Sequence, residues 1–259
     1  MTSADHSYYG LMASTWDVGR DTQVRWADSI FYLRIVQQYG QPVLDVGCAT
    51  GRIVLDYLAQ GIDIDGVDSS LEMLARCRGK AAALGLAPDL YQQRMETLDL
   101  PRTYGTILIP SSSFQLLTDP AQARAAMGHC FAQLQTGGAL VMSIAFDWHA
   151  GEPIDTGWKL AFEKVRPEDG ARVRSWAHTW VEPDQHLMHT EQRYEVELNG
   201  TVIAREEHRQ SPETRWYSQA QMVELFSAAG FVDIQLFRGF TGEAATPEDR
   251  LFCALGVKP

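Results

Sequence analysis

The 259-residue sequence lacks any apolar run of about 18 residues, the length that a membrane-spanning helix needs. Residues 1 to 6 are polar, with no basic segment followed by an apolar one, so the sequence shows no secretory signal. Both absences argue against a membrane protein and against a membrane partner. We expect the protein to be cytoplasmic.

Basic residues are few: 22 Lys and Arg stand against 33 Asp and Glu, for a net charge of -11. A field of this sign repels the phosphates of nucleic acids and of anionic lipids. We therefore expect no nucleic-acid partner.

Cysteine is also scarce. The four cysteines show no C-x-x-C spacing, and no cysteine or histidine pattern matches a zinc site. Neither a metal nor a disulfide is expected. The cysteines are instead predicted to be reduced thiols in the core: Cys48, Cys77, Cys130 and Cys253.

The most informative segment runs from Val43 to Gly51 and reads VLDVGCATG. A short apolar strand leads into a loop with two glycines, a helical pattern follows, and a second apolar run stops at Asp68. Because Gly47 and Gly51 have no Cβ, the loop can adopt positive φ angles, and a ligand can lie against its backbone beside the unpaired N–H groups of the next helix. An acid at the tip of the second strand can accept both hydroxyls of a ribose. The segment therefore predicts a nucleoside-binding βαβ unit.

Glycine spacing and charge indicate which nucleoside binds. The pyrophosphate-binding pattern G-x-G-x-x-G needs a glycine where this sequence has Ala49. Asp45, just before the loop, would repel a pyrophosphate but suits a ligand with an ammonium and a sulfonium group. The segment favours S-adenosylmethionine (SAM) over NAD, and an NAD-dependent oxidoreductase is the weaker alternative.

At these residues the chain resembles the class I SAM-dependent methyltransferases, whose first motif commonly reads (V/L)LD(V/I)GCGTG. Ala49 replaces the central glycine and narrows the space near the methionine part of SAM. The segment GVDSS at residues 66–70, with Met73, resembles the second motif, in which the acid holds the ribose and the next residues flank adenine. The resemblance covers residues 40–147 well and the rest loosely. It implies S-adenosyl-L-methionine as cofactor, S-adenosyl-L-homocysteine (SAH) as product, and contacts from Asp45, Gly47, Cys48, Ala49, Gly51, Asp68, Ser69 and Met73.

The order of apolar patterns predicts a doubly wound, Rossmann-like α/β fold. Helix and strand patterns alternate with short joints, which implies a seven-stranded, mostly parallel sheet with helices on both faces. By resemblance, the seventh strand lies antiparallel beside the fifth. Strands are expected at residues 42–46, 62–67, 90–93, 106–109, 139–146, 231–237 and 251–257, and helices at 22–39, 52–60, 71–84, 120–134 and 219–229.

Residues 149–216 interrupt this rhythm. Asn199-Gly200 lies between two strand-like runs and is typical of a type I′ hairpin turn, and Asp169-Gly170 indicates another turn. We expect an inserted antiparallel β sheet that serves as a lid or pairs across a dimer, so monomer and homodimer both stay open. The predicted organisation is a helical cap at residues 1–39, a SAM-binding core at 40–148, the insertion at 149–216 and the rest of the core at 217–259.

Weaker candidates complete the predicted cofactor site. Met95 is expected to cover the adenine face, and Glu96 to replace the acid that family members often carry near the adenine amino group. Ser111 follows the fourth strand, beside the tip of the first. In the family the N-terminal segment folds over the SAM pocket, where Tyr9 or Trp16 would pack on the cofactor. Structural alternatives exist, because Met95 is equally typical of a core position and the two aromatics of helix–sheet packing.

Methyl transfer from a sulfonium is an in-line displacement, which needs alignment in a water-poor pocket and no nucleophile from the protein. A base is needed only if the acceptor must lose a proton, and His149 and Tyr217 are the candidates unless they are structural or lid residues. Both are expected at the acceptor site together with Ser112, Phe114 and Gln115; Phe114 is alternatively a core residue.

The acceptor is expected to be a small molecule that is methylated on O or N. Strand four ends in Ile-Pro-Ser-Ser, which departs from the Asn/Asp-Pro-Pro-Tyr/Phe pattern of family members that act on nucleic-acid bases or on protein glutamine. A protein that binds SAM or SAH without catalysis is the alternative.

Overall fold

The computed structural model describes residues 8–20, 27–145, 148 and 151–259. The chain divides into two compact units. The core unit consists of Arg25–Asp147 and Trp216–Pro259, and the inserted unit of Met1–Val24 and Trp148–Arg215. The predicted helical cap of residues 1–39 is thus divided between the two units.

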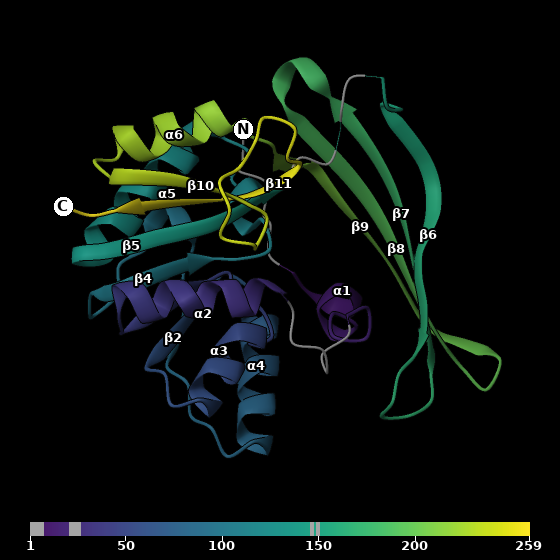
Figure 1. Ribbon diagram of the computed structural model, residues 1–259. Helices are drawn as coiled ribbons and strands as arrows, with labels where there is room; N and C mark the ends of the chain where they lie inside the picture. The colour runs from purple at the N-terminus through teal and green to yellow at the C-terminus, as the bar shows by residue number, and fades with distance from the viewer. Residues whose placement is uncertain (1–7, 21–26, 146–147, 149–150) are drawn as a thin grey trace. The chain divides into compact units, whose positions relative to one another are not determined.

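The core unit is built on a seven-stranded sheet with the order β10-β11-β5-β4-β1-β2-β3 (Figure 1). Neighbouring strands from β5 to β3 are parallel, whereas β11 is antiparallel to both β5 and β10. The predicted mostly parallel sheet, with a late strand antiparallel beside the fifth, is confirmed. The strands are β1 (Val43–Val46), β2 (Ile64–Asp68), β3 (Leu90–Gln92), β4 (Tyr104–Ile109), β5 (Leu134–Ala145), β10 (Val232–Arg238) and β11 (Leu251–Val257).

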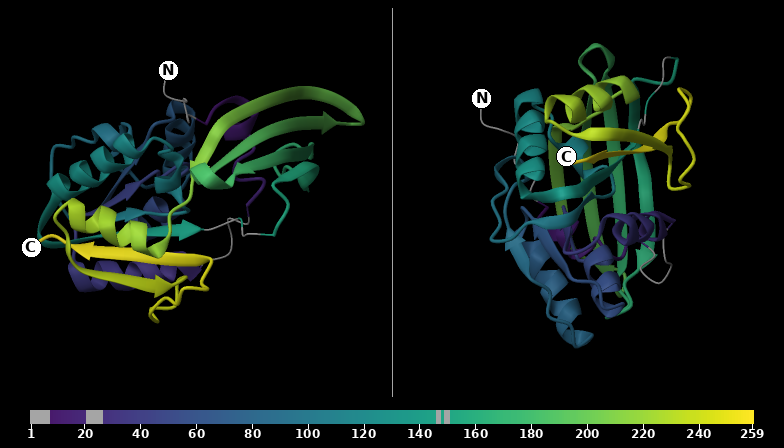
Figure 2. Two further views of the ribbon diagram at one scale, coloured as in Figure 1. Left: turned by 90° about the horizontal axis from the view of Figure 1, so that it is seen from above. Right: turned by 60° about the vertical axis from the view of Figure 1, so that its left-hand side comes forward.

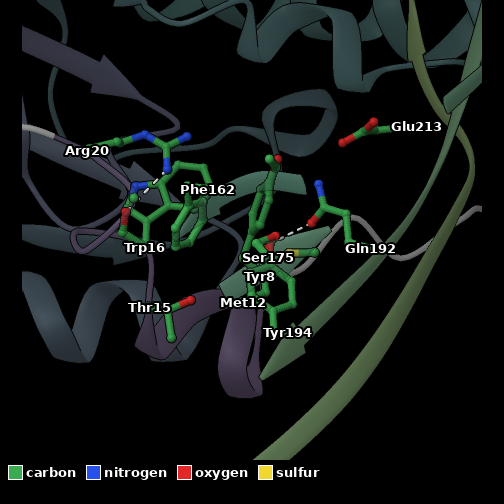
Figure 3. A pocket seen from close by; sticks show the side chains of 12 residues that line it. Tyr8, Met12, Thr15, Trp16, Arg20, Phe162, Ser175, Gln192, Tyr194 and Glu213 are labelled. Atoms are coloured by element: carbon green, nitrogen blue, oxygen red, sulfur yellow. Dashed lines mark hydrogen bonds between the residues drawn. The ribbon is translucent and has the colours of Figure 1, made fainter. Parts of the chain in front are cut away.

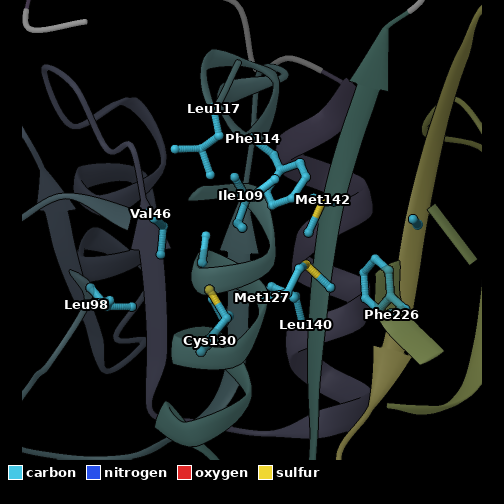
Figure 4. Close-up of a cluster of buried hydrophobic side chains, with 14 of the residues drawn as sticks. Val46, Leu98, Ile109, Phe114, Leu117, Met127, Cys130, Leu140, Met142 and Phe226 are labelled. Atoms are coloured by element: carbon cyan, nitrogen blue, oxygen red, sulfur yellow. The ribbon is translucent and has the colours of Figure 1, made fainter. Parts of the chain in front are cut away.

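Helices cover both faces of this sheet because successive side chains in a strand point to opposite sides. Val46 and Ile109 belong to a cluster with α5 (Pro120–Gln133) and α6 (Gln219–Ala228), which Figure 4 shows. Val43 and Leu108, one residue out of phase in the alternation, belong to a second cluster with α2 (Ala27–Tyr39) and α3 (Arg52–Ala59). Helix α4 (Leu71–Ala83) adds Leu74 to the second cluster.

Local sequence sets where these helices begin. Ser70 caps α4 by accepting a hydrogen bond from the Met73 N–H, and Ser218 forms a capping box with Gln221 at the start of α6. Asp119 caps α5, and Pro120 takes the first helical position, where its missing N–H costs nothing.

The start of β5 differs from the expected strand at 139–146. Strand β5 begins at Leu134, directly after α5, and its pairing with β4 shifts register between Tyr104 and Thr106. Gly138 permits this irregular pairing, because a Cβ there would lie 2.8 Å from the backbone oxygen of Gly105. Gly137 and Gly138 therefore both lie inside β5.

The inserted unit is a four-stranded antiparallel sheet, in the order β6-β7-β8-β9, with the short helix α1 (Gly10–Ser14). Figure 2 shows the long strands of this sheet from two further directions. Asn199 and Gly200 both have positive φ, 51° and 78°, which confirms the predicted type I′ turn between β8 and β9. The antiparallel insertion is confirmed. Its strands are β6 (Asp155–Val165), β7 (Arg172–Glu182), β8 (Leu187–Leu198) and β9 (Thr201–Arg215).

All four cysteines are free and buried, as expected for core thiols. Within the described ranges, no helix combines the length and the apolar character needed to cross a bilayer.

Candidate functional site

The candidate site lies where the core sheet changes direction of winding. Strand β1 pairs with β2 on one side and with β4 on the other, so the loops that follow β1 and β4 leave the same edge of the sheet side by side. In open parallel sheets, ligands bind at this topological switch point. A Cβ added to Gly47, in the first loop, would lie 2.9 Å from Oγ of Ser113 in the second.

The loop after β1 uses three left-handed residues. Gly47, Ala49 and Gly51 have φ angles of 79°, 48° and 87°. Helix α3 begins directly after Gly51, so its first N–H groups border the loop. The side chain of Cys48 is buried in the core, and the N–H groups of Gly47 and Cys48 both donate to the Val67 carbonyl. The loop thus presents backbone and very little side chain.

Asp68, at the end of β2, is held on both carboxylate oxygens. The Ala49 N–H donates to Oδ2 at 2.9 Å, and the Ser70 N–H donates to Oδ1 at 2.8 Å. Burial raises the pKa of this carboxyl, and the hydrogen bonds from the backbone oppose the shift. A carboxylate has about four acceptor positions, so the two bonds leave capacity for hydroxyls of a ligand.

Asp45, inside β1, is fully buried, and its Oδ1 has no hydrogen-bond partner among the described residues. Burial raises the pKa of this carboxyl to about 7; Arg52 opposes the shift, whereas Asp68 and Asp28 add to it. A buried acid without a partner is costly, and a cation brought to it would offset that cost.

Asp28 and Arg52 belong to the site although the sequence interpretation missed them. Arg52 Nη1 donates to Asp28 Oδ1 at 2.9 Å and Nη2 to Oδ2 at 2.5 Å, which joins α2 to the first turn of α3. Asp28 is buried, and it lies one helical turn before the buried residues Phe31 and Tyr32. An acid on the apolar stripe of the predicted helix was the signal that could have revealed this pair.

The other predicted cofactor residues come after β2 and β3 in the chain. Ser69 is half-buried, whereas Met73 is fully buried beneath the start of α4. Met95 packs partly against the core, and Glu96 pairs with Arg94 at 2.6 Å. Their contacts with a cofactor stay predictions.

The loop after β4 contains Ser111 and Ser112, both with positive φ (54° and 58°). Ser111 is exposed, and the Ser112 N–H donates to Ser143 Oγ at 3.2 Å. Two consecutive strained residues at a loop are typical of a functional site.

Phe114 and Gln115 are buried more deeply than their predicted acceptor role requires. Phe114 is completely buried and lies 5.7 Å from the Tyr217 ring, measured between centroids. Gln115 Nε2 donates to the Ala145 carbonyl, and its Oε1 accepts from the Ala145 N–H. The structure gives both side chains a positioning role, Phe114 as the core residue that the alternative interpretation described. Contact of either side chain with an acceptor stays a prediction.

The two candidates for a catalytic base have different standing. Tyr217 is buried, and its hydroxyl donates a long hydrogen bond of 3.4 Å to the Leu117 carbonyl. His149 lies outside the described residues.

Tyr9 and Trp16, the aromatics predicted to pack on the cofactor, belong to the inserted unit. There Tyr9 packs on His208 and Trp16 on Tyr8. Their predicted roles stay predictions.

The arrangement as a whole favours a cationic nucleoside. Three acids, Asp28, Asp45 and Asp68, lie around a loop with little side chain; of the neighbouring cations, Arg52 is paired with Asp28 and Lys80 donates to Thr50 Oγ1 at 2.9 Å. Such a site repels a pyrophosphate and attracts an ammonium or sulfonium. No cluster of three or more metal-binding side chains occurs among the residues whose placement is described.

Comparison with known proteins finds a family model that matches part of the chain and a relative similar over most of it. The family model described as "Methyltransferase domain" matches residues 43–138. A candidate methyltransferase of Geobacillus sp. (strain WCH70) is 25% identical over 228 residues, which cover 86% of this chain and 88% of that protein.

Solved structures agree on the fold. A structure titled as an S-adenosylmethionine-dependent methyltransferase from Clostridium acetobutylicum ATCC 824 has a TM-score of 0.76 at 17% identity and covers 95% of this chain and 97% of its own. The sugar N-methyltransferase KedS8 from Streptoalloteichus sp ATCC 53650 has a TM-score of 0.72 at 21% identity, with 100% and 98% covered. Both similarities extend over the inserted sheet as well as the core.

Proposed function

We propose that this chain is a class I SAM-dependent methyltransferase, as the family model that matches residues 43–138 supports, and that it transfers the methyl group of SAM to an O or N atom of a small molecule. The observation that carries the proposal is the environment of Asp45: a buried carboxyl with an unpartnered oxygen, directly before a loop of left-handed backbone. A ligand with a positive charge would pair with this carboxyl, and a ribose on the same ligand would bind beside the loop.

The residues present fit SAM. Asp68 would hold the ribose hydroxyls through the acceptor positions that Ala49 and Ser70 leave open. Asp45 would face the cationic methionine part, and Gly47 and Gly51 would let that part approach the backbone. An NAD-dependent oxidoreductase is a poorer fit, since the same acids would face a pyrophosphate.

SAM, when bound, supplies an electrophilic methyl carbon whose bond to sulfur breaks as the bond to the acceptor forms. The protein has to orient the acceptor in line and to exclude water. The loop after β4, which adjoins the Gly47 loop, is the wall of the core unit best placed for orientation. Tyr217 is the described candidate for a base, and it could take a proton from the acceptor only after its hydroxyl has left the Leu117 carbonyl and given its own proton to water.

A small-molecule acceptor is supported by the net charge of -11 and by similarity to a sugar N-methyltransferase. An acidic protein attracts a cationic amine and repels a phosphate backbone.

Calorimetry with SAM and SAH tests the cofactor site. We expect micromolar affinity for both ligands and a loss of at least about tenfold in Asp68→Ala, because a ribose hydroxyl loses a charged acceptor. Asp89→Ala is the matched control, since Asp89 is an exposed acid at the start of the neighbouring strand. If neither ligand binds, or if both variants keep the same affinity, the assignment fails.

Incubation with methyl-labelled SAM and a metabolite extract, followed by mass spectrometry, tests the transfer. Labelled small molecules support the enzyme, and their fragmentation identifies the methylated atom. Binding of SAM with no labelled product above a heat-denatured control would favour the non-catalytic alternative.

A further inference from the structure

A cavity of about 400 Å³ lies within the inserted unit, between the segment around α1 and one face of the four-stranded sheet. Its size is in the range of small-molecule sites. Figure 3 shows the lining side chains, with Trp16 and Phe162 on one side of the cavity and Gln192 and Glu213 on the other. Neither motif of the cofactor site contributes to it.

The pairing of β6, β7 and β8 places the side chains that line the sheet side of the cavity next to one another. Phe162 pairs with Ser175 across β6 and β7, and Ser175 pairs with Tyr194 across β7 and β8. Residues that pair across strands share one face, so these three side chains form a row. Gly19, on the opposite segment, allows the close approach, because a Cβ there would lie 3.0 Å from the Phe162 ring.

Four aromatic side chains contribute to the walls. Tyr8 and Trp16 come from the N-terminal segment, with ring centroids 4.9 Å apart, and Phe162 and Tyr194 come from the sheet. Met12 and Ala161 add apolar surface. Ring faces and edges from two sides favour a flat ring as the occupant, since stacked and edge-to-face pairs are the arrangements that aromatic groups prefer.

The polar groups in the cavity offer few free hydrogen bonds. The Tyr194 hydroxyl donates to Gln192 Oε1 at 2.6 Å, and Thr15 Oγ1 donates to the Leu11 carbonyl at 2.7 Å. Burial raises the pKa of Tyr194 to about 12, so its hydroxyl keeps its proton. The hydrogen bond from the Tyr194 hydroxyl fixes the side chain of Gln192. The hydrogens on Gln192 Nε2 are not donated to any described residue. This amide is a donor for an acceptor atom of a ligand.

Charge in the cavity disfavours an anion. Arg20 is the cation among the lining residues, and its guanidinium already lies 3.4 Å from the centre of the Trp16 ring, while Glu213 brings a negative charge. A sugar fits less well than a flat ring, because each of its hydroxyls needs a partner and the Thr15 and Tyr194 hydrogens are already donated within the protein.

We propose that this cavity binds a flat, uncharged aromatic ring that carries a carbonyl or another hydrogen-bond acceptor, held by Gln192 Nε2 and stacked among Trp16, Phe162 and Tyr194. This proposal does not rest on the proposed function.

The test uses the full chain and 2-quinolinone, a flat bicyclic amide, in saturation-transfer NMR and calorimetry. The saturated analogue perhydro-2-quinolinone has the same amide without the flat ring, and methyl α-D-glucopyranoside represents a sugar. We expect saturable binding of 2-quinolinone and at least about fivefold weaker binding of the other two compounds.

Two variants locate the binding. Gln192→Glu keeps the acceptor for the Tyr194 hydroxyl but removes the free N–H donor, and we expect affinity for 2-quinolinone to fall about tenfold. Phe162→Leu removes a ring from the wall, and we expect a loss of about fivefold. The matched controls are Gln37→Glu, on the exposed side of α2, and Trp158→Leu, on β6 outside the cavity; both should bind like the wild type.

SAH affinity is measured on every preparation, which shows that each variant is folded and separates the two proposals. Binding of 2-quinolinone without SAH binding would overturn the proposed function and support the ring site. SAH binding without 2-quinolinone binding overturns the ring site, as does equal binding of the saturated analogue, preference for the glucoside, or unchanged affinity in both cavity variants.

Discussion

Ala49 occupies a backbone conformation that suits glycine better. Its φ of 48° lies in the left-handed region, where an L side chain costs about 1 kcal/mol or more. We expect Ala49→Gly to raise the free energy of unfolding by about 0.5 to 1 kcal/mol in urea titrations. This value allows for the greater entropy that glycine gives the unfolded chain, which offsets part of the relieved strain. Ala75→Gly, on the exposed side of α4, is the control, and it should lower the same quantity by about 1 kcal/mol. Destabilisation by both changes would contradict this account of the loop.

Asp45 makes stability depend on pH. Its ordinary pKa is 3.8 and its folded pKa is about 7, so between these values the folded protein retains a proton that the unfolded chain releases. The stabilisation is complete below the unfolded value and is lost as the pH rises through about 7. We expect Asp45→Asn to have a shallower decline in the free energy of unfolding between pH 5 and pH 8, measured by urea titration. Parallel curves for the variant and the wild type would exclude Asp45 as the cause.

The affinity for SAM should rise with pH, whereas the stability contributed by Asp45 falls. A cationic ligand favours the ionised carboxylate, so SAM affinity should increase by up to about tenfold per pH unit below 7 and then level off. Calorimetry from pH 5.5 to pH 8 checks this, with Asp45→Asn as the variant that should show a flat profile. A wild-type affinity that is constant over this range would contradict the contact between Asp45 and the cationic part of SAM.

At the scale of elements, the Asp28–Arg52 pair fixes α2 to the start of α3. Removing one member of a buried ion pair leaves the other uncompensated, so we expect Asp28→Asn to lower the free energy of unfolding by about 3 kcal/mol. Asp63→Asn is the matched control, because Asp63 also binds an arginine, Arg102, through both oxygens but is 56% exposed. Urea titration should show a change below about 1 kcal/mol for the control. Equal losses in the two variants would contradict the role given to burial.

Element prediction succeeded where the pattern was long or where capping residues marked an end. Strand β11 was predicted with its observed bounds, and α4 and α6 begin at the predicted residues, behind the capping serines. Helix α1 was missed, since five residues are too short to produce a periodic pattern. The start of β5 was predicted late, because Gly137 and Gly138 resemble a turn and the space that requires glycine comes from β4.

At the scale of the molecule, the two units should respond separately to the methyl donor. A ligand stabilises the unit that binds it in proportion to the logarithm of its concentration over Kd. Hydrogen exchange with saturating SAH should therefore protect amides of residues 43–73 and 90–97, and leave most amides of β6 to β9 unchanged. The same experiment without ligand is the reference. Equal protection of both units would show that they open as one, or that SAH contacts both.

One short segment of the sequence predicts the methyl-donor site. The strand, the left-handed loop and the acid of a nucleoside site lie within one βαβ unit, so their chemistry can be recognised from residues 43 to 68. The loop binds through its backbone, and a backbone conformation is recorded locally by glycine and by spacing. The departure from the common motif, Ala49, lies in the same segment.

Long-range packing sets which side chains from distant parts of the sequence lie close together. The partnership of Asp28 with Arg52 depends on how α2 packs on the sheet, and the cavity of the inserted unit joins Trp16, Phe162 and Gln192 from three separate stretches of chain. The register of antiparallel strands places such residues on one face, and a shift by one residue would turn them to the other. Local sequence therefore specifies the methyl donor, whereas long-range packing builds the place where a second molecule can bind.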